Sequence, residues 1–286
     1  MSDILMEKCL AAKAAGASLA ASKGELRNHA IALMADALER DMDYILAENA
    51  KDLENAAKSG MRQSLVDRLA LNPARISAMA GALRKVAALP DPLGGGTVWT
   101  RPNGLRIRKV KVPIGLIAII FEARPNVTAD AAAICIKSGN TCVLRGGKEA
   151  LLSSAAIVKS VKSALRESGL EESCVQIVED PTRESSNRLM CLNGVVDLLI
   201  PRGGRSLIRA VVDNATVPVI ETGAGNCHIY VEKSADTEMA LNIVCNAKMS
   251  RPSVCNAAES LLIDREIAAS FLPLLKARMD AVELRG

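Results

Sequence analysis

The segment at residues 249–256 (MSRPSVCN) sets one cysteine beside features that suit nucleophilic chemistry. Arg251 precedes Cys255 closely, and a nearby cation favours the thiolate, which is the form of cysteine that attacks electrophiles. A cysteine taken alone is more often a small buried residue, so this segment leaves a structural and a catalytic interpretation open. Only together with Asn126, Glu221 and two glycine-rich turns earlier in the chain does the catalytic interpretation predict transfer of an acyl group to the Cys255 thiol, followed by hydride transfer.

Two further polar residues follow short apolar runs. Asn126 comes after residues 115–121 (GLIAIIF), and Glu221 ends the run at residues 218–220. Asn126 would by default cap the next helix, or its amide would donate to a developing oxyanion. Glu221 would by default be a surface carboxylate, or it would act as a general base or orient water beside a thiol.

Two glycine-rich turns carry paired cations, at residues 145–148 (RGGK) and 201–206 (PRGGRS). Glycine lets backbone N–H groups approach a phosphate closely, although it also simply shapes tight turns. Neither turn matches GxxxxGK[ST] or GxGxxG, and the GAG at residues 223–225 lacks the third glycine and precedes a strand. Two such turns favour a phosphate-rich cofactor. Arg145 and Lys148 would suit a 2′-phosphate, which predicts NADP rather than NAD.

The elements that must position these residues alternate along the middle of the chain. Predicted strands at residues 115–121, 141–144, 174–178, 195–200 and 218–220 alternate with predicted helices at 129–137, 151–167, 183–191 and 204–213. Continuously apolar strands separated by amphipathic helices predict an α/β fold with a doubly wound parallel sheet. Ligands bind beyond the carboxyl ends of the strands in such sheets, which is where both glycine-rich turns lie.

The flanking segments differ from this pattern. Residues 2–89 read as helical, with breaks at Gly60 and at Asn72-Pro73, because apolar residues recur three and four apart. Residues 98–101 and 105–112 flank Pro102-Asn103-Gly104 and predict a protruding hairpin, which we interpret as an oligomer contact. We predict a dinucleotide-binding domain at 1–221 and an incomplete second α/β catalytic domain at 222–286, with strands at 228–231 and 258–263 and helices at 236–247 and 264–279.

Composition excludes several functional classes. The chain has 286 residues, a net charge of +4 and only 2% aromatic residues, which disfavours stacking on nucleic-acid bases. Its eight cysteines form no CxxC pair and it has two histidines, so we expect no metal site. No signal peptide is evident, and the longest apolar run, residues 116–121, is too short to span a bilayer. We therefore expect no membrane association and a reducing, cytoplasmic location.

Several segments together resemble the γ-glutamyl phosphate reductases, a branch of the aldehyde dehydrogenase superfamily. They are residues 219–228 (VIETGAGNCH), 240–248 (ALNIVCNAK), 251–256 (RPSVCN), 121–128 (FEARPNVT), 143–150 (VLRGGKEA), 48–52 (ENAKD) and 67–69 (DRL). The resemblance covers essentially the whole chain. It is specific to the reductase branch, because aldehyde-oxidising relatives would show PWN where residues 124–126 read RPN.

By position, the resemblance implies a role for each candidate residue. Cys255 would be the nucleophile, Asn126 the oxyanion-hole residue, and Glu221 the carboxylate that serves as base in the oxidising relatives. The cofactor turns carry over as well: Arg145 would contact the adenosine ribose, Gly146, Gly147 and Lys148 complete that turn, and Gly203 and Gly204 would meet the pyrophosphate.

The implied reaction is the NADPH-dependent conversion of L-glutamyl 5-phosphate to L-glutamate 5-semialdehyde through a Cys255 thioester, a step of proline biosynthesis. Asn126 and the Cys255 backbone N–H would stabilise the tetrahedral oxyanion, and water must be kept from the thioester. The resemblance also implies a homo-oligomer when full length and functional coupling to glutamate 5-kinase.

The family's chain continues beyond the point where this sequence ends, so we expect activity to depend on a further segment that completes the catalytic domain. Two alternatives stand beside the reductase. A catalytically inactive dinucleotide-binding fragment would bind NADPH without turnover. A CoA-acylating aldehyde dehydrogenase is the other alternative, and Arg124 and residues 251–253 argue against it by resemblance.

Overall fold

The chain divides into two compact units, Met1–Thr222 and Gly223–Gly286. The computed structural model describes residues 3–221, 223, 225–252 and 254–286. Ser2, Thr222, Ala224 and Ser253, which the sequence predictions include, lie outside the described residues. Each unit is described by itself below.

The first unit is built on the predicted parallel sheet. Its four strands are β3 (Leu116–Phe121), β4 (Thr141–Arg145), β5 (Val175–Ile177) and β6 (Leu198–Arg202), in the order β5-β4-β3-β6. From β3 the chain adds β4 and then β5 on one side of β3, and it then returns to add β6 on the other side. The direction in which strands are added therefore reverses between β3 and β6. This doubly wound arrangement confirms the predicted fold class, and it places the topological switch point at the carboxyl ends of β3 and β6.

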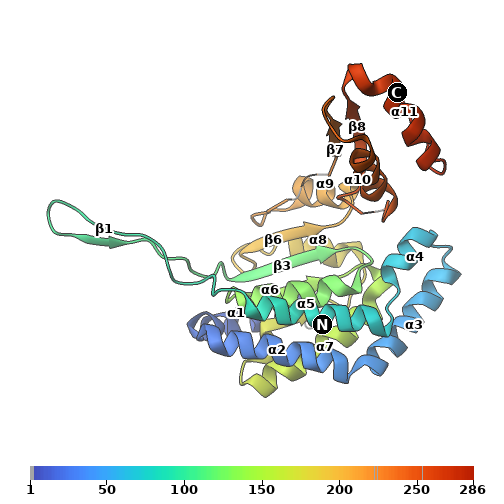
Figure 1. Cartoon of the computed structure of the whole chain (residues 1–286). Helices are drawn as coiled ribbons and strands as arrows, with labels where there is room; N and C mark the ends of the chain where they lie inside the picture. The colour runs from blue at the N-terminus through green and yellow to red at the C-terminus, as the bar shows by residue number, and fades with distance from the viewer. Residues whose placement is uncertain (1–2, 222, 224, 253) are drawn as a thin grey trace. The chain divides into compact units, whose positions relative to one another are not determined.

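The two faces of the sheet belong to two separate hydrophobic cores, because successive side chains of a strand point to opposite sides. Ile117, Ile119 and Phe121 of β3 face the core covered by α2, α5, α6 and α7, whereas the alternating Leu116, Ala118 and Ile120 face the core covered by α1, α8 and α9. Figure 1 shows α5 and α6 lying along one face of β3. All six β3 residues are buried, which explains the unbroken apolar run in the sequence.

The helices of this unit follow the sequence periodicity closely. They are α1 (Ile4–Ala21), α2 (Gly24–Arg40), α3 (Met42–Lys58), α4 (Gln63–Leu69), α5 (Pro73–Ala88), α6 (Pro125–Lys137), α7 (Leu151–Ser168), α8 (Arg183–Met190) and α9 (Arg205–Asn214). Both predicted breaks are present, since α3 ends before Gly60 and Asn72 caps α5 with its side-chain oxygen. A further break at Ser22 and Lys23 separates α1 from α2 and was not predicted.

Several predicted strands are shorter than expected, and the strand predicted at 195–200 spans Leu198–Arg202 instead. Residues 218–220 form only an isolated bridge, in which Val219 pairs with Leu199, rather than a full strand. In the hairpin, β1 (Val98–Thr100) pairs with β2 (Arg106–Arg108) in an antiparallel ribbon that extends away from the body of this unit in Figure 1. The ribbon is almost wholly solvent-exposed, so side-chain packing supplies little to lengthen its ladder.

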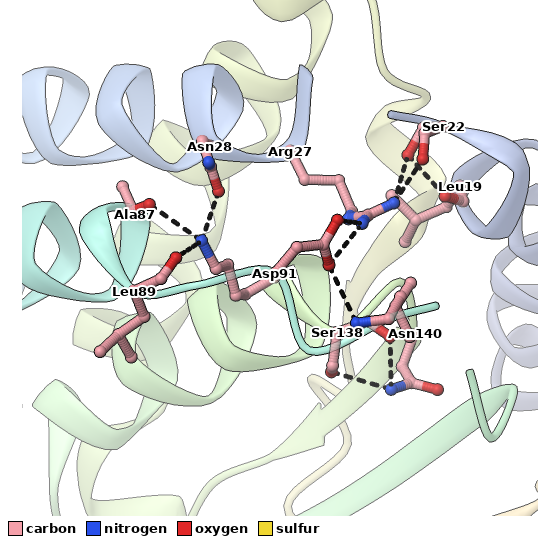
Figure 2. A network of polar contacts seen from close by, with 11 residues as sticks. Leu19, Ser22, Arg27, Asn28, Ala87, Leu89, Asp91, Ser138 and Asn140 are labelled. Atoms are coloured by element: carbon pink, nitrogen blue, oxygen red, sulfur yellow. Dashed lines mark hydrogen bonds and ion pairs between the residues drawn. The ribbon is translucent and has the colours of Figure 1, made fainter. Parts of the chain in front are cut away.

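A buried polar network anchors the root of this ribbon (Figure 2). Arg27 on α2 is 2% exposed, and its Nη2 donates to both carboxylate oxygens of Asp91, at 2.9 and 2.7 Å. The Nζ of Lys137 donates to Asn28 Oδ1 and to two backbone carbonyls at the end of α5. Asn140 Oδ1 accepts from the two N–H groups that lead into β3, at 2.6 and 2.9 Å. The network thereby ties the helical segment to both ends of the ribbon.

The second unit pairs two parallel strands, β7 (Cys227–Val231) and β8 (Ala258–Ile263), with two helices, α10 (Thr237–Met249) and α11 (Arg265–Arg278). Its core contains Val231, Leu241, Phe271 and Leu275. Asp236 and Asp264 cap the two helices through their side chains. Among the described residues, no helix combines the length and the apolar character needed to cross a bilayer.

Candidate functional site

The turns that follow β3 and β6 meet at the switch point of the sheet. Oε2 of Glu122, the first residue after β3, accepts a hydrogen bond from the N–H of Gly204 at 3.1 Å. The Glu122 N–H donates to the carbonyl of Arg202 at 3.3 Å, which is a second hydrogen bond between the two turns. A Cβ on Gly203 would lie 2.7 Å from the Glu122 Cδ, so a larger residue there would push this carboxylate from its position.

The turn after β4 approaches the same place. A Cβ on Gly147 would lie 3.5 Å from the backbone nitrogen of Ala123 and 3.6 Å from the carbonyl carbon of Glu122. Gly146, the preceding residue, packs against Phe121, since a Cβ on Gly146 would lie 3.2 Å from the ring of Phe121. Three turns from strands far apart in the sequence therefore converge on Glu122 and Ala123. We call the group formed by Glu122, Gly147, Gly203 and Gly204 the switch-point cradle.

The chemistry of the cradle fits a pyrophosphate group. Gly204 is the N-cap of α9, where unpaired N–H groups and the helix dipole favour negative charge. The Glu122 carboxylate accepts a hydrogen bond from the Gly204 N–H, as a phosphate oxygen would. Arg202 and Arg205 flank the two glycines and are exposed, which adds positive charge to the turn. Gly203 and Gly204, with Arg202 and Arg205 beside them, would hold the pyrophosphate of a dinucleotide in place of the Glu122 carboxylate.

Arg145 ends β4 and braces the neighbouring turn. Its Nη2 donates to the carbonyl oxygens of Pro181 and Thr182, at 2.8 and 3.2 Å, just before α8 begins. Burial lowers the pKa of the guanidinium, and its buried Nε has no hydrogen-bond partner among the described residues. Lys148, by contrast, is exposed at the start of the short 3-10 helix Lys148–Ala150. Arg145 is thus held by backbone carbonyls, whereas Lys148 is exposed to solvent.

Asn126 does not cap the helix that follows it. Arg124 is the N-cap of α6 and Pro125 its first residue, so Asn126 lies inside the first turn. Its Nδ2 donates to Oδ2 of Asp130, one helical turn later, at 3.2 Å. Burial raises the pKa of Asp130, and the hydrogen bond from Asn126 opposes that rise. The default cap interpretation is therefore wrong, and the amide is oriented by a carboxylate that the sequence analysis missed.

Glu221 lies near the carboxyl edge of the sheet. The preceding residue, Ile220, donates its N–H to the carbonyl of Leu199 in β6 at 3.0 Å, which fixes the backbone beside the switch point. The Glu221 side chain is exposed. The first unit thus gathers Asn126, Glu221 and both glycine-rich turns at one edge of its sheet.

Cys255 belongs to the second unit, where it sits in a tight turn between α10 and β8. The Val254 N–H donates to the Arg251 carbonyl at 3.3 Å, and the Ala257 N–H donates to the Val254 carbonyl at 3.2 Å. Cys255 is exposed, which rules out the buried structural interpretation of this cysteine. Ser253, in the same turn, lies outside the described residues.

Two residues of the second unit hold the Cys255 turn, and the sequence analysis assigned them no role. The Cys227 thiol donates to the Cys255 carbonyl, with 3.6 Å between sulfur and oxygen. Gly225 lies against the same carbonyl, and a Cβ there would overlap it. The sequence offers no signal for either contact beyond their position just before the strand expected at residues 228–231. In the part of the chain that the structure describes, no group of three or more His, Cys, Asp or Glu residues is arranged to hold a metal ion.

Comparison with known proteins places this geometry in a family. The profile of the aldehyde dehydrogenase family matches residues 6–285. A γ-glutamyl phosphate reductase from Thermoanaerobacter sp. (strain X514) is 50% identical over 282 residues, which cover 98% of this chain and 68% of that protein. A second, from Caldicellulosiruptor bescii, is 51% identical over 99% of this chain and 68% of its own length.

A solved structure agrees with these sequence relatives. The crystal structure of γ-glutamyl phosphate reductase from Thermotoga maritima superposes with a TM-score of 0.90 at 45% identity, and covers 98% of this chain and 68% of that one. The family profile, at residues 6–285, spans both units of the chain. The chain therefore belongs to the aldehyde dehydrogenase family, within its γ-glutamyl phosphate reductase branch.

Proposed function

We propose that this chain acts as a γ-glutamyl phosphate reductase in proline biosynthesis, converting L-glutamyl 5-phosphate to L-glutamate 5-semialdehyde. Family membership implies an oxidoreductase with a nicotinamide dinucleotide cofactor and a small-molecule substrate. The observation that carries the proposal is the switch-point cradle, an anion-holding group in a chain half identical to enzymes of this name. That identity does not favour an inactive fragment or a CoA-acylating enzyme.

The proposed first step is acyl transfer to Cys255. The thiolate attacks the acyl carbon of the acyl phosphate, a C–S bond forms, and phosphate leaves with the electron pair of the C–O bond. Cys255 is exposed in its turn, so an incoming acyl phosphate can reach the thiol. The proposal requires that Asn126 faces the same acyl group, where its amide and the Cys255 N–H would donate to the oxyanion.

The second step is reduction of the thioester. When bound, the dinucleotide supplies the hydride equivalent that this reduction needs. Gly203 and Gly204 would hold its pyrophosphate, while the turn at Gly146 and Gly147 lets the adenosine ribose approach the backbone. Collapse of the resulting oxyanion expels the Cys255 thiolate and releases the aldehyde.

We propose NADP rather than NAD from the contacts of Arg145 and the exposure of Lys148 after β4. Arg145 is held by backbone carbonyls and would shape the ribose site, while the exposed Lys148 would pair with a 2′-phosphate. Glu221 has no necessary proton transfer in the reductive direction. In the reverse direction it is the candidate base that takes the Cys255 thiol proton. We further propose a cytoplasmic location, a homo-oligomer formed through the ribbon, and coupling to glutamate 5-kinase.

The test is the reverse reaction, measured with the purified 286-residue chain as reduction of NADP that depends on both glutamate 5-semialdehyde and phosphate. We expect turnover that Cys255→Ser abolishes and that Cys191→Ser, a second exposed cysteine, leaves intact. Turnover that survives in Cys255→Ser would overturn the assigned nucleophile. Dinucleotide binding without any turnover would instead support the inactive alternative.

A further inference from the structure

We propose that Cys227 is a resolving thiol for Cys255, which forms a reversible disulfide with it when hydrogen peroxide oxidises the Cys255 thiol. The proposal rests on the proposed function at one point, the nucleophilic character of Cys255. It assigns a modification site to two cysteines of the second unit and a protective role to a residue outside the reaction itself.

The contact between the two residues is direct. The Cys227 sulfur lies 3.6 Å from the carbonyl oxygen of Cys255, within the range of a thiol hydrogen bond. The sheet fixes this contact, because Cys227 begins β7 and pairs with Ala258, the first residue of β8. Cys255 precedes Ala258 by a single tight turn, so its position follows from the start of β8.

Gly225 supports the same arrangement independently. A Cβ at this position would overlap the Cys255 carbonyl, and it would lie 3.8 Å from the Cys255 Cβ. Gly225 and Cys227 therefore both lie against the same carbonyl oxygen of the Cys255 turn. The backbone carrying Cys227 is thus brought close to both the main chain and the Cβ of Cys255. Close backbone approach of this kind is what a disulfide requires, since its Cα atoms usually lie about 4.4–6.8 Å apart.

Exposure separates these two thiols from most others in the chain. Cys255 is exposed and Cys227 half-buried, whereas Cys9, Cys135, Cys142 and Cys174 are buried in the first unit. Burial raises the pKa of the Cys9 thiol to about 11 and that of Cys174 to about 12, which keeps both protonated and unreactive. Cys245, on α10, is the other half-buried thiol of the second unit and serves as a matched comparison.

The chemistry balances with peroxide as the only co-reactant. The Cys255 thiolate attacks one peroxide oxygen, an S–O bond forms, the O–O bond breaks, and the departing hydroxide takes a proton to become water. The Cys227 thiol then loses its proton and attacks the sulfur of the Cys255 sulfenic acid. An S–S bond forms, the S–O bond breaks, and a second water leaves. Two thiols and one peroxide give one disulfide and two waters.

The disulfide would stop the oxidation at a reversible stage. Without a nearby thiol, a sulfenic acid proceeds to sulfinic and sulfonic acids, which are not restored by ordinary thiol reductants. A disulfide at Cys255 is restored by exchange with a thiol. Cys227 would therefore preserve the nucleophile during oxidative stress at the cost of temporary inactivity.

The experiment treats the whole chain with hydrogen peroxide and follows Cys255 by peptide mapping and mass spectrometry. We expect a linked pair of peptides containing Cys227 and Cys255 that dithiothreitol separates with both thiols regenerated. In Cys227→Ser, and equally in Cys227→Ala, Cys255 should reach the sulfinic and sulfonic stages several-fold faster. Cys245→Ser should keep the wild-type pattern, and matching thermal melts of the variants would exclude misfolding as the cause.

Sulfinic acid at Cys255 of the wild type beside an intact Cys227 thiol would overturn the proposal. Equal rates of irreversible oxidation in the wild type and Cys227→Ser would overturn it as well. This readout is independent of enzyme activity. Failure of the proposed function would appear as turnover surviving in Cys255→Ser, while failure of this inference would appear only in the oxidation products.

Discussion

The carboxylate of Glu122 accepts a hydrogen bond from the backbone N–H of Gly204, with 3.1 Å between Oε2 and the nitrogen. The two residues are 82 positions apart in the sequence, and they lie in the turns after β3 and β6, the strands that border the switch point. A negative charge therefore occupies the N-terminus of α9, where the proposed function places the pyrophosphate of the dinucleotide. Binding of the dinucleotide must then displace this carboxylate or accommodate its charge.

Replacing Glu122 with glutamine should tighten dinucleotide binding. The substitution removes the charge that opposes a phosphate while keeping the length of the side chain. Charges at a helix N-terminus are worth about 0.3–1 kcal/mol, so we expect the Kd for NADPH to fall about 2- to 5-fold. Isothermal titration calorimetry checks this, with Glu7→Gln in the first turn of α1 as the control. Weaker binding in Glu122→Gln would mean that the carboxylate contacts the dinucleotide favourably.

Asn126 and Asp130 should contribute unequally to turnover. Asn126→Ala removes a proposed oxyanion donor, which costs about 10²–10³-fold in kcat. Asp130→Ala leaves the amide in place but without its orienting partner at 3.2 Å, and misplacement of a catalytic group by about 1 Å costs on the order of 10²-fold or less. Steady-state kinetics should show both losses in kcat with little change in KM. A rise in KM alone would point to substrate binding.

Asp130→Asn should have an effect on stability that depends on pH. Burial raises the pKa of Asp130, so the folded state disfavours its ionised form. The carboxyl group therefore contributes most to the free energy of unfolding at low pH. This contribution falls as the pH rises from the pKa of the unfolded state, about 3.9, through the raised pKa of the folded state. In thermal melts, the Tm of the wild type should fall relative to that of Asp130→Asn as the pH rises from low to neutral. A difference in Tm that stays constant across this range would contradict the assignment.

Lys148 should discriminate between the two nicotinamide dinucleotides. Lys148→Glu reverses the charge that the proposed 2′-phosphate would meet, and hydrogen bonds to charged groups are worth about 1.5–3 kcal/mol. We expect the preference for NADPH over NADH to fall by about ten-fold or more, as measured by the Kd of each. Lys85→Glu, at an exposed position on α5, should leave the preference unchanged. An equal loss for both dinucleotides would remove Lys148 from the specificity site.

Asp91, whose partner Arg27 is buried, should stabilise the first unit far more than an aspartate that pairs with an exposed arginine. Asp91→Ala leaves the buried Arg27 guanidinium without its charged partner, which we expect to cost roughly 2 kcal/mol of unfolding free energy. Asp36→Ala, which breaks an exposed pair with Arg84, should cost about 1 kcal/mol or less. Urea denaturation monitored by circular dichroism compares the two. Equal costs would show that the network in Figure 2 adds nothing beyond a surface pair.

The Asp91 contribution should also depend on pH, with the opposite sign to that of Asp130. The Leu93 N–H, and after it Arg27, lower the pKa of the Asp91 carboxyl. Its stabilising effect is present above the unfolded pKa of about 3.9 and is lost as pH falls through the lowered folded value. The advantage of the wild type over Asp91→Asn should therefore shrink below about pH 4 in the same denaturation experiment.

Much of the fold was predictable because it is encoded locally. The six buried residues of β3 are continuously apolar in the sequence, and Asn72-Pro73 and the Asn103-Gly104 turn mark element boundaries through their own backbone preferences. Residues 218–220 show the limit of this reasoning. Their composition favours a strand, but the length of the strand depends on how long a neighbouring strand stays within hydrogen-bonding distance, and only Val219 pairs.

The candidate residues were identifiable by type, while their partners were not. Cys255, Asn126 and the two glycine-rich turns stand out by composition and by resemblance, which are properties of single segments. The cap predicted for Asn126 was wrong because Pro125 begins the helix one residue earlier, which moves the amide inside the first turn towards Asp130.

The sequence by itself determined the alternation of strands and helices, the exposed character of the ribbon, and the residue types that can do chemistry. The tertiary structure alone decided that Glu122 meets Gly204, that Arg145 braces the turn before α8, and that Cys227 meets the Cys255 turn. The reason is physical. Helix periodicity and turn preferences act between neighbours in the chain, whereas the pairing of parallel strands brings together turns separated by tens of residues, and no local preference records which turns will meet.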